Sequence, residues 1–324
     1  MKTKRIITFM LCLSLLIPST YIKAKTATSG VDENGNKWTY DTTTKTLTFS
    51  GTKDIEDFSM NGHDPEPAWY EWSEKTEHIV IEDGITGIGE NAFYLFTEVT
   101  TVTMGDSVKK IKAMAFDGNV SLKSIRLSPN ITIIGNNALS GCQKLSNVSL
   151  PSRLKKMCSF SGNSKLKKIE LPDTIEYMES CMFCDCKEIT DIHLPAKLKT
   201  IQCYDFANCR KLIKLDIPTS VKKVYMSAFA GSGLKKIVLP KNVTTIKNGD
   251  YGNKVFKYIK GNGYPTKNLR VIEIHSKKVK SIQKNSFSGL SSKVVIKVPK
   301  SRKKKYTKML RKSGLSKKVK IKAL

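Results

Sequence analysis

Cysteines are the residues of this chain whose spacing most suggests chemistry. Cys181, Cys184 and Cys186 form a Cys-x-x-Cys-x-Cys run, and Cys203 and Cys209 follow it. Thiolates at such spacing can ligate zinc, but a structural zinc site usually pairs two close clusters or adds nearby histidines around a tetrahedron. Here the second cluster is only two separated cysteines. The spacing therefore favours packed thiols, and we expect neither a metal nor another cofactor.

Histidine is the second candidate for chemistry, and the chain has four of them. His193 lies between Ile192 and Leu194, so its side chain is expected to point outward from a strand. Glu170 and Asp216 occupy the corresponding places in the adjacent sequence repeats. Such a triad could look catalytic, yet alternating outward charges are ordinary on a solvated sheet. Without a phosphate-binding glycine loop or a convincing carboxylate pair, we expect no enzymatic activity.

These residues belong to an internal repeat with a period of mostly 23 residues. Each repeat carries the motif aliphatic-x-x-aliphatic-x-aliphatic, usually closed by proline. Clear copies begin at Leu122, Leu145, Leu166, Ile189, Leu212 and Leu234. The apolar alternation closed by proline predicts a short strand. With one strand per repeat, neighbouring repeats would pair in a parallel sheet, which predicts a solenoid whose core forms only by stacking.

A second motif follows each strand. It is an aliphatic pair three residues apart, such as Val108 and Ile111, and then a pair resembling Ala-Phe, such as 115–116. Further along, Cys142, Cys186 and Cys209 occupy one repeat position that Asn119 and Asn163 occupy in other repeats. Equivalent positions stack in a solenoid, so these cysteines are predicted to be buried ladder residues.

Two other cysteines suggest a covalent link. Cys158 and Cys181 both lie two residues before the repeat phenylalanine, and equivalent positions of paired strands are about 5 Å apart. That separation is within the range of a disulfide, which an exported protein can form. A bridge from Cys158 to Cys181 is therefore a hypothesis.

The combined repeat pattern, clearest at residues 166–186 and 189–209, resembles the BspA-like leucine-rich repeats of bacterial secreted and cell-surface proteins. The resemblance covers roughly residues 30–324. It implies a leucine-rich repeat solenoid with a short parallel strand in each repeat of 21–24 residues, irregular or short helical connections, and a cap at each end. It also implies adhesion, or interaction with a protein or glycan, in place of catalysis.

The chain divides into four expected parts. These are a signal peptide at 1–24 with cleavage near 24 or 27, an amino-terminal cap module at 28–77, repeats at 78–299 with a loop insertion at about 247–268, and a basic carboxyl-terminal cap at 300–324. In the last part, Ser301 is expected to cap a helix that buries Tyr306 and Leu310. Gly314 would end that helix, and a strand would follow at 319–321.

Charge is distributed unevenly along the chain. The formal net charge is +28, but residues 28–77 hold 11 acids and 4 bases, whereas residues 300–324 hold 12 bases and no acid. Within the repeats, lysines recur between the paired aliphatic residues and should stack along one side. The candidate contacts for a polyanion are Lys109, Lys110, Lys155, Lys156, Lys222, Lys223, Lys303, Lys304 and Lys305.

Two functional hypotheses follow from these patterns. The first is a secreted, non-enzymatic protein that binds a protein or glycan ligand through outward strand residues, with Arg126, Glu170, His193 and Asp216 as the candidate face. The second is binding of an anionic cell-wall polymer or glycosaminoglycan through the lysines and the basic tail. Specific nucleic-acid binding is disfavoured because the basic segments lack interleaved aromatic residues. No later apolar stretch is long enough to span a membrane.

Overall fold

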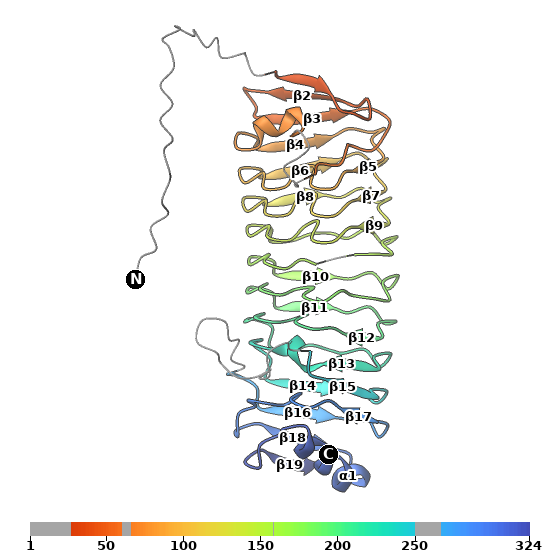
Figure 1. The fold of residues 1–324 in the computed structure, drawn as a ribbon, viewed down its shortest axis with the longest axis vertical. Coiled ribbons are helices and arrows are strands. Elements are labelled where there is room, and N and C mark those ends of the chain that lie inside the picture. Colours follow the sequence, from red (N-terminus) through yellow and green to blue (C-terminus); the bar gives the residue numbers. More distant parts are fainter. Residues whose placement is uncertain (1–26, 60–65, 158, 250–266) are drawn as a thin grey trace, which may run out of the picture.

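The computed structural model describes residues 27–59, 66–157, 159–249 and 267–324. The expected signal peptide therefore lies outside the described residues, as does most of the expected insertion. The described chain winds into one elongated solenoid in which successive repeats stack along the long axis (Figure 1).

One column of strands follows the predicted apolar alternation. It starts with three antiparallel-paired strands, β1 (Ser29–Val31), β2 (Lys37–Asp41) and β3 (Thr46–Ser50), and continues in parallel through β4 (His78–Ile81), β6 (Thr101–Met104) and β8 (Ser124–Arg126). The later members are the pair β10 (Lys168–Glu170) and β11 (Asp191–His193), and the set β14 (Lys236–Leu239), β16 (Val271–Ile274), β18 (Val295–Val298) and β19 (Lys320–Ala323). Neighbouring β10 and β11 match the repeat alignment, with Ile169 opposite Ile192.

The predicted solenoid of short parallel strands is confirmed, but a second column of very short strands also forms at the paired aliphatic residues (Figure 1). Its members are β5 (Gly87–Ile88), β7 (Lys110–Ile111), β9 (Ile133–Ile134), β12 (Thr200–Ile201), β13 (Lys223–Tyr225), β15 (Thr245–Lys247) and β17 (Ser281–Ile282). Most of these strands contain two residues, too few for an alternating pattern to reveal them in the sequence.

Two expected strands are not formed, at 145–150 and 212–217. Leu145 and Leu215 are still buried there, so the apolar residues pack as predicted while the backbone does not pair as a strand. These segments begin the two repeats that are shorter than 23 residues, with 21 residues from Leu145 to Leu166 and 22 from Leu212 to Leu234. We attribute the lost pairing to this change in repeat length, which shifts backbone donors and acceptors out of register.

The core between the two columns is a stack of equivalent side chains from successive repeats. Phe160, Phe183, Phe206 and Phe229 are buried and nearly parallel, with ring centroids 6.2 to 6.3 Å apart. Because each ring packs on the equivalent ring of the next repeat, no repeat could bury its apolar side alone.

The predicted ladder of buried polar side chains is present. The thiols of Cys142, Cys186 and Cys209 are fully buried and donate to the backbone oxygens of Phe116, Phe160 and Phe183, respectively. At equivalent positions, Asn119 accepts a hydrogen bond from the Phe96 amide and Asn163 donates to the Leu139 oxygen. Burial raises the pKa of the Cys186 thiol to about 12, so this thiol stays protonated and acts as a donor.

The carboxyl-terminal end contains the expected helix, but Ser301 does not form the expected N-cap of that helix. The 3-10 turn η3 (Lys300–Arg302) precedes α1 (Lys303–Lys312), whose N-cap residue is Arg302, and no side-chain hydrogen bond caps it. Tyr306 and Leu310 are buried as predicted, and Gly314 follows the helix with a φ of 92°. Two further 3-10 turns, η1 (Ala68–Trp72) and η2 (Met226–Phe229), contribute buried side chains to the core.

A column of left-handed backbone positions turns the chain after each phenylalanine. Gly118, Gly141 and Gly162 adopt φ values of 75°, 69° and 78°, whereas Leu95 occupies the equivalent position with a φ of 57°. A side chain at Gly141 would place its Cβ 3.2 Å from the Cα of Gly118 in the adjacent repeat. Glycine at this position therefore provides both backbone conformation and close repeat stacking.

We predict that Gly141→Ala lowers the free energy of unfolding by about 1 to 2 kcal/mol, because alanine would have to adopt the left-handed conformation against a neighbouring backbone. Urea-induced unfolding followed by circular dichroism measures the change. Leu95→Gly is the matched control, and it should keep or raise the midpoint because it relieves the same strain. Equal destabilisation by both substitutions would contradict the role of the left-handed column.

Candidate functional site

The outward residues of the first strand column lie opposite one another wherever its strands pair. Glu170 lies opposite His193 in the β10–β11 pair, and Val238, Glu273 and Lys297 lie opposite one another in β14, β16 and β18. Alternation within β10 and β11 leaves the central isoleucine buried and the residues on each side exposed. Glu170 and His193 therefore point outward in this pair, whereas Glu273 in β16 is buried.

Three of the four predicted face residues meet in one hollow of about 670 Å³. Glu170, His193 and Asp216 line it together with Lys168 and Asp191. A second hollow of about 350 Å³ also includes Lys168 and Glu170 and extends over residues 147–150. The two hollows cover β10 and β11 and the adjoining segments where strand pairing is lost. We call this combined surface the strand-face hollow.

Arg126, the fourth predicted face residue, does not line either hollow. Its guanidinium group donates to the Met104 backbone oxygen at 2.6 Å and pairs with the Asp106 carboxylate at 3.1 Å. These contacts hold the Arg126 side chain against the preceding repeat. The structure thus separates Arg126 from the group formed by Glu170, His193 and Asp216.

Carboxylates outnumber lysines in the strand-face hollow. Lys168 lies 2.8 Å from Glu170 and 3.9 Å from Asp191, and Lys214 lies 2.8 Å from Asp216. The hydrogen bond from Lys168 lowers the pKa of Glu170, so that carboxylate is ionised at neutral pH. Because all these side chains are exposed, the ion pairs are weak and a ligand can replace them. Chemically, the hollow can accept hydrogen bonds from ammonium, guanidinium or hydroxyl groups.

A buried ionic cluster lies farther along the same strand column, and the sequence pattern did not single it out. Only 8% of the Glu273 side chain is exposed, and its carboxylate is within 3.2 Å of Lys236, His275 and Lys297. Burial opposes ionisation of Glu273, but hydrogen bonds from these three groups outweigh it and lower its pKa to about 2. Two lysine ammonium groups and a hydrogen bond with the His275 ring therefore keep this carboxylate charged inside the sheet surface.

The lysine rows lie along the second strand column, but they stack only in part. Lys110 pairs with Ile133, and Ile133 pairs with Lys156, so the two lysines are separated by an intervening strand. Their backbones are consequently about 10 Å apart, twice the expected spacing. Lys110 also forms an ion pair with Asp54 at 2.6 Å. Directly adjacent lysines occur at Lys199 and Lys222, whose backbones hydrogen-bond at 2.9 Å.

The other lysines that are predicted to contact a polyanion lie either along the second strand column or in the first turn of α1. Lys109 and Lys155 flank the Thr132 segment, to which both are joined by backbone hydrogen bonds. Lys223 belongs to β13 and lies between Thr200 and Thr245. Lys303, Lys304 and Lys305 form the exposed first turn of α1 at the far end of the solenoid. The candidate polyanion contacts are thus divided between an interrupted row and a terminal patch.

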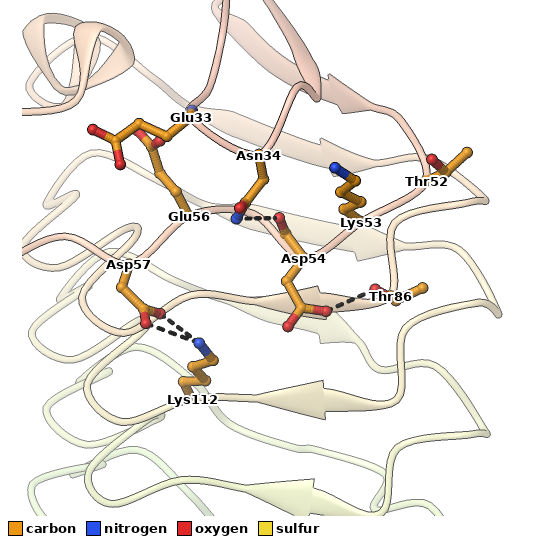
Figure 2. A pocket seen from close by; sticks show the side chains of 9 residues that line it. All are labelled: Glu33, Asn34, Thr52, Lys53, Asp54, Glu56, Asp57, Thr86 and Lys112. Carbon is orange, nitrogen blue, oxygen red and sulfur yellow. Dashed lines mark hydrogen bonds and ion pairs between the residues drawn. The ribbon is translucent and has the colours of Figure 1, made fainter.

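An acidic hollow of about 610 Å³ lies at the opposite end, where the amino-terminal strands meet the first repeats (Figure 2). Asp54 accepts a hydrogen bond from Thr86 at 2.7 Å, and Asp57 pairs with Lys112 at 2.8 Å. Burial raises the pKa of Glu56, which also lines this hollow. The hollow could not be predicted from the sequence because its residues lie far apart in the chain, although the acidic excess of residues 28–77 is a signal for it.

Metal and disulfide chemistry were tested against the same geometry. In residues 27–59, 66–157, 159–249 and 267–324, no group of three or more histidine, cysteine or acidic side chains is arranged to hold a metal ion. Cys158 lies outside the described residues, so its bridge to Cys181 stays a hypothesis. None of the helices in the described chain is both long and apolar enough to cross a membrane.

The repeat architecture can be compared with known families. The family model of the BspA type leucine-rich repeat region matches six copies, over residues 66–161, 156–258 and 257–323. The chain belongs to the BspA-type leucine-rich repeat family. Among curated proteins, none matches this BspA-type chain.

Solved structures show the same fold. A leucine-rich repeat protein from Bacteroides ovatus is 23% identical to this BspA-type chain with a TM-score of 0.61, over 89% of this chain and 75% of the other. One from Eubacterium ventriosum is 20% identical with a TM-score of 0.55, over 82% of this chain and 76% of the other. At these identities the likeness establishes the solenoid fold and leaves the ligand of the BspA-type repeats open.

We predict that Glu273→Gln destabilises the protein near neutral pH by about 2 kcal/mol, because it leaves a cluster of cations without its carboxylate. A carboxylate whose folded pKa is about 2 and whose ordinary value is 4.5 contributes stability above pH 4.5, and this contribution is lost as the pH falls toward 2. The variant should therefore lack this part of the acid dependence when unfolding midpoints are measured against pH.

Glu170→Gln serves as the matched control for this cluster. Its carboxylate is exposed and paired with one lysine, so the substitution should leave the midpoint and the acid profile nearly unchanged. Identical acid profiles for the wild type and Glu273→Gln would show that the cluster contributes nothing to stability.

Proposed function

We propose that this chain is a secreted, non-enzymatic recognition protein that binds a protein or glycan partner through the strand-face hollow. The observation that carries the proposal is the gathering of Glu170, Asp191, His193 and Asp216 around one accessible depression. Leucine-rich repeat solenoids present extended faces of this kind to their partners, which supports the assignment. The excess of carboxylates favours partner groups that donate hydrogen bonds or carry positive charge.

Export of the chain is part of the same proposal. Lys2, Lys4 and Arg5 precede an apolar run over residues 6–17, and small residues follow near Ala24. This order of charged, apolar and small segments is typical of a secretory signal. The BspA-type resemblance to secreted and cell-surface proteins agrees with it. An extracellular location would expose the strand-face hollow to host or neighbouring-cell molecules.

The hollow can be tested by reversing its charge. We expect the double variant Glu170→Lys and Asp216→Lys to recover at least about tenfold less partner than the wild type from host mucosal and bacterial envelope extracts, since a loss of about 1.4 kcal/mol is tenfold in affinity. Quantitative mass spectrometry at two salt concentrations would identify the proteins and glycans that respond.

The matched control changes the same charges in the same part of the solenoid. Glu176→Lys and Glu188→Lys lie outside both hollows, so this double variant should recover the same molecules as the wild type. If both double variants lose the same partners equally, recognition depends on total charge, and the strand-face hollow is not the site.

A second function is favoured by the carboxyl-terminal patch, defined as the basic residues of 300–324. None of the ion pairs of the described residues involves these bases, and nearly all of their side chains are exposed. Lys303, Lys304 and Lys305 lie in the first turn of α1, where positive charge opposes the helix dipole. Because no carboxylate of the described residues pairs with these lysines and the helix dipole opposes them, we propose that the patch binds an anionic polymer such as a cell-wall polymer or glycosaminoglycan.

Charge reversal of the three lysines tests this patch. A lysine at an anionic surface contributes about 1 kcal/mol, so Lys303→Glu, Lys304→Glu and Lys305→Glu together should weaken heparin and teichoic acid binding at least tenfold. Reversal of Lys123, Lys165 and Lys167 is the control with equal net charge, and it should have a smaller effect. Equal losses would assign the binding to overall basicity.

A further inference from the structure

Cys181 and Cys184 lie at the two ends of one tight turn. They belong neither to the buried ladder of thiols nor to the strand-face hollow. The Cys184 amide donates to the Cys181 backbone oxygen at 3.2 Å, which closes the turn and places one thiol at each end of it. Both residues are partly exposed, whereas the ladder thiols are fully buried. Solvent molecules can therefore reach this pair and not the ladder.

The solenoid does not require cysteines at these positions. Cys181 has a left-handed φ of 66°, and the equivalent position two residues before the repeat phenylalanine or leucine holds Asn91, Asn137 or Asn285 elsewhere. Residues equivalent to Cys184 include Ala207 and Ser140. No other repeat has cysteine at both positions. Packing alone thus leaves the pair unexplained.

Neighbouring repeats hold the backbone of the turn on both sides. The Cys181 amide donates to the Cys203 backbone oxygen at 2.9 Å, and the Ser159 hydroxyl donates to the Cys181 backbone oxygen at 2.9 Å. These bonds position the two thiols without any covalent link between them. The two thiols are therefore preorganised for a reaction in which one thiol reacts first and the other thiol reacts second.

The environment makes the two thiols different. Hydrogen bonding from Cys184 stabilises the Cys181 thiolate and lowers the pKa of Cys181 to about 7, in spite of partial burial and the nearby Asp185. The same hydrogen bond, followed by burial, raises the pKa of Cys184, whose thiol also donates to the Asp185 carboxylate at 3.5 Å. Cys203 and the buried Asp205 are the other titratable groups near Cys181, and burial raises both of their pKa values.

We propose that Cys181 and Cys184 form a thiol–disulfide exchange site that reacts with low-molecular-weight disulfides. The Cys181 thiolate, having released its proton to solvent, attacks one sulfur of the substrate disulfide. A new sulfur–sulfur bond forms, the substrate bond breaks, and the first substrate half leaves as a thiolate that takes up a proton.

The second step closes the site. As Cys184 loses its proton to solvent, its sulfur attacks the Cys181 sulfur and displaces the second substrate half as a thiolate, which takes up a proton from solvent. In the net reaction, two protein thiols are oxidised to one disulfide and the substrate disulfide is reduced to two thiols. Glutathione disulfide is the simplest probe of this substrate class.

Peptide mapping tests the proposal on the full chain. The protein is reduced, freed of reductant, exposed to glutathione disulfide near neutral pH, and alkylated under denaturing conditions. Trypsin releases peptide 169–187, which contains Cys181, Cys184 and Cys186. We expect this peptide to be internally disulfide-bonded, with its one alkylated thiol at Cys186.

Alternative pairings would overturn the proposal and are directly visible. A link to peptide 157–165 would place the bridge at Cys158, and a link to peptide 200–210 would place it at Cys203 or Cys209. Recovery of fully reduced peptide 169–187 would show that no exchange occurs. In the native reduced protein, Cys181 should also be alkylated at least about tenfold faster than Cys186, and equal rates would contradict the proposed nucleophile.

Near-isosteric variants separate the two roles. Cys184→Ser should stop the reaction at a stable glutathione adduct on Cys181, whereas Cys181→Ser should form neither adduct nor internal bridge. Cys203→Ser is the matched control for a partly buried thiol, and it should react like the wild type. Loss of exchange in the control, with circular dichroism showing an intact fold, would move the site away from the pair.

Discussion

Hydrogen bonding between the backbones of successive repeats is the interaction on which the rest of the structure depends. It fixes an offset of about one repeat between donor and acceptor, as between Ile192 and Ile169 in the paired strands. Once that offset is set, each residue type of the repeat falls into a column. The stacked phenylalanines, the thiol and amide ladder, and the left-handed glycines are consequences of this register, and each column in turn stabilises the register.

The features that recur with the period could be predicted from the sequence. The strand residues around Ile169 and the buried Cys142 and Cys186 repeat at fixed steps, so their burial follows from alignment alone. The second strand column escaped prediction because a two-residue strand such as β7 has no measurable alternation. The failed strands at 145–150 and 212–217 escaped it because hydrogen bonding responds to a change of one or two residues that barely affects the motif.

The outward direction of the candidate site residues could be predicted from the sequence, but the hollow that they line could not. Alternation placed Glu170, His193 and Asp216 on the outer face, yet their common hollow depends on the neighbouring segments that lose strand pairing. Contacts such as Lys112 with Asp57 and Lys236 with Glu273 join residues that no periodic pattern relates. Such pairs compensate positive charge locally, whereas the bases of the carboxyl-terminal patch take part in no ion pair of the described residues.

The pairing of β14 with β16 shows how tolerant the array is of added chain. Ile237 and Ile272 are opposite each other although 35 residues separate them, and the neighbouring β15 and β17 are in register as well. The register of these two pairs therefore depends on where the chain leaves and re-enters the strand columns, and the added residues between them do not disturb it. Residues added to the chain between 249 and 267 should therefore leave the pairing of β14 with β16 and of β15 with β17 unchanged, so the repeats on both sides could serve as a scaffold.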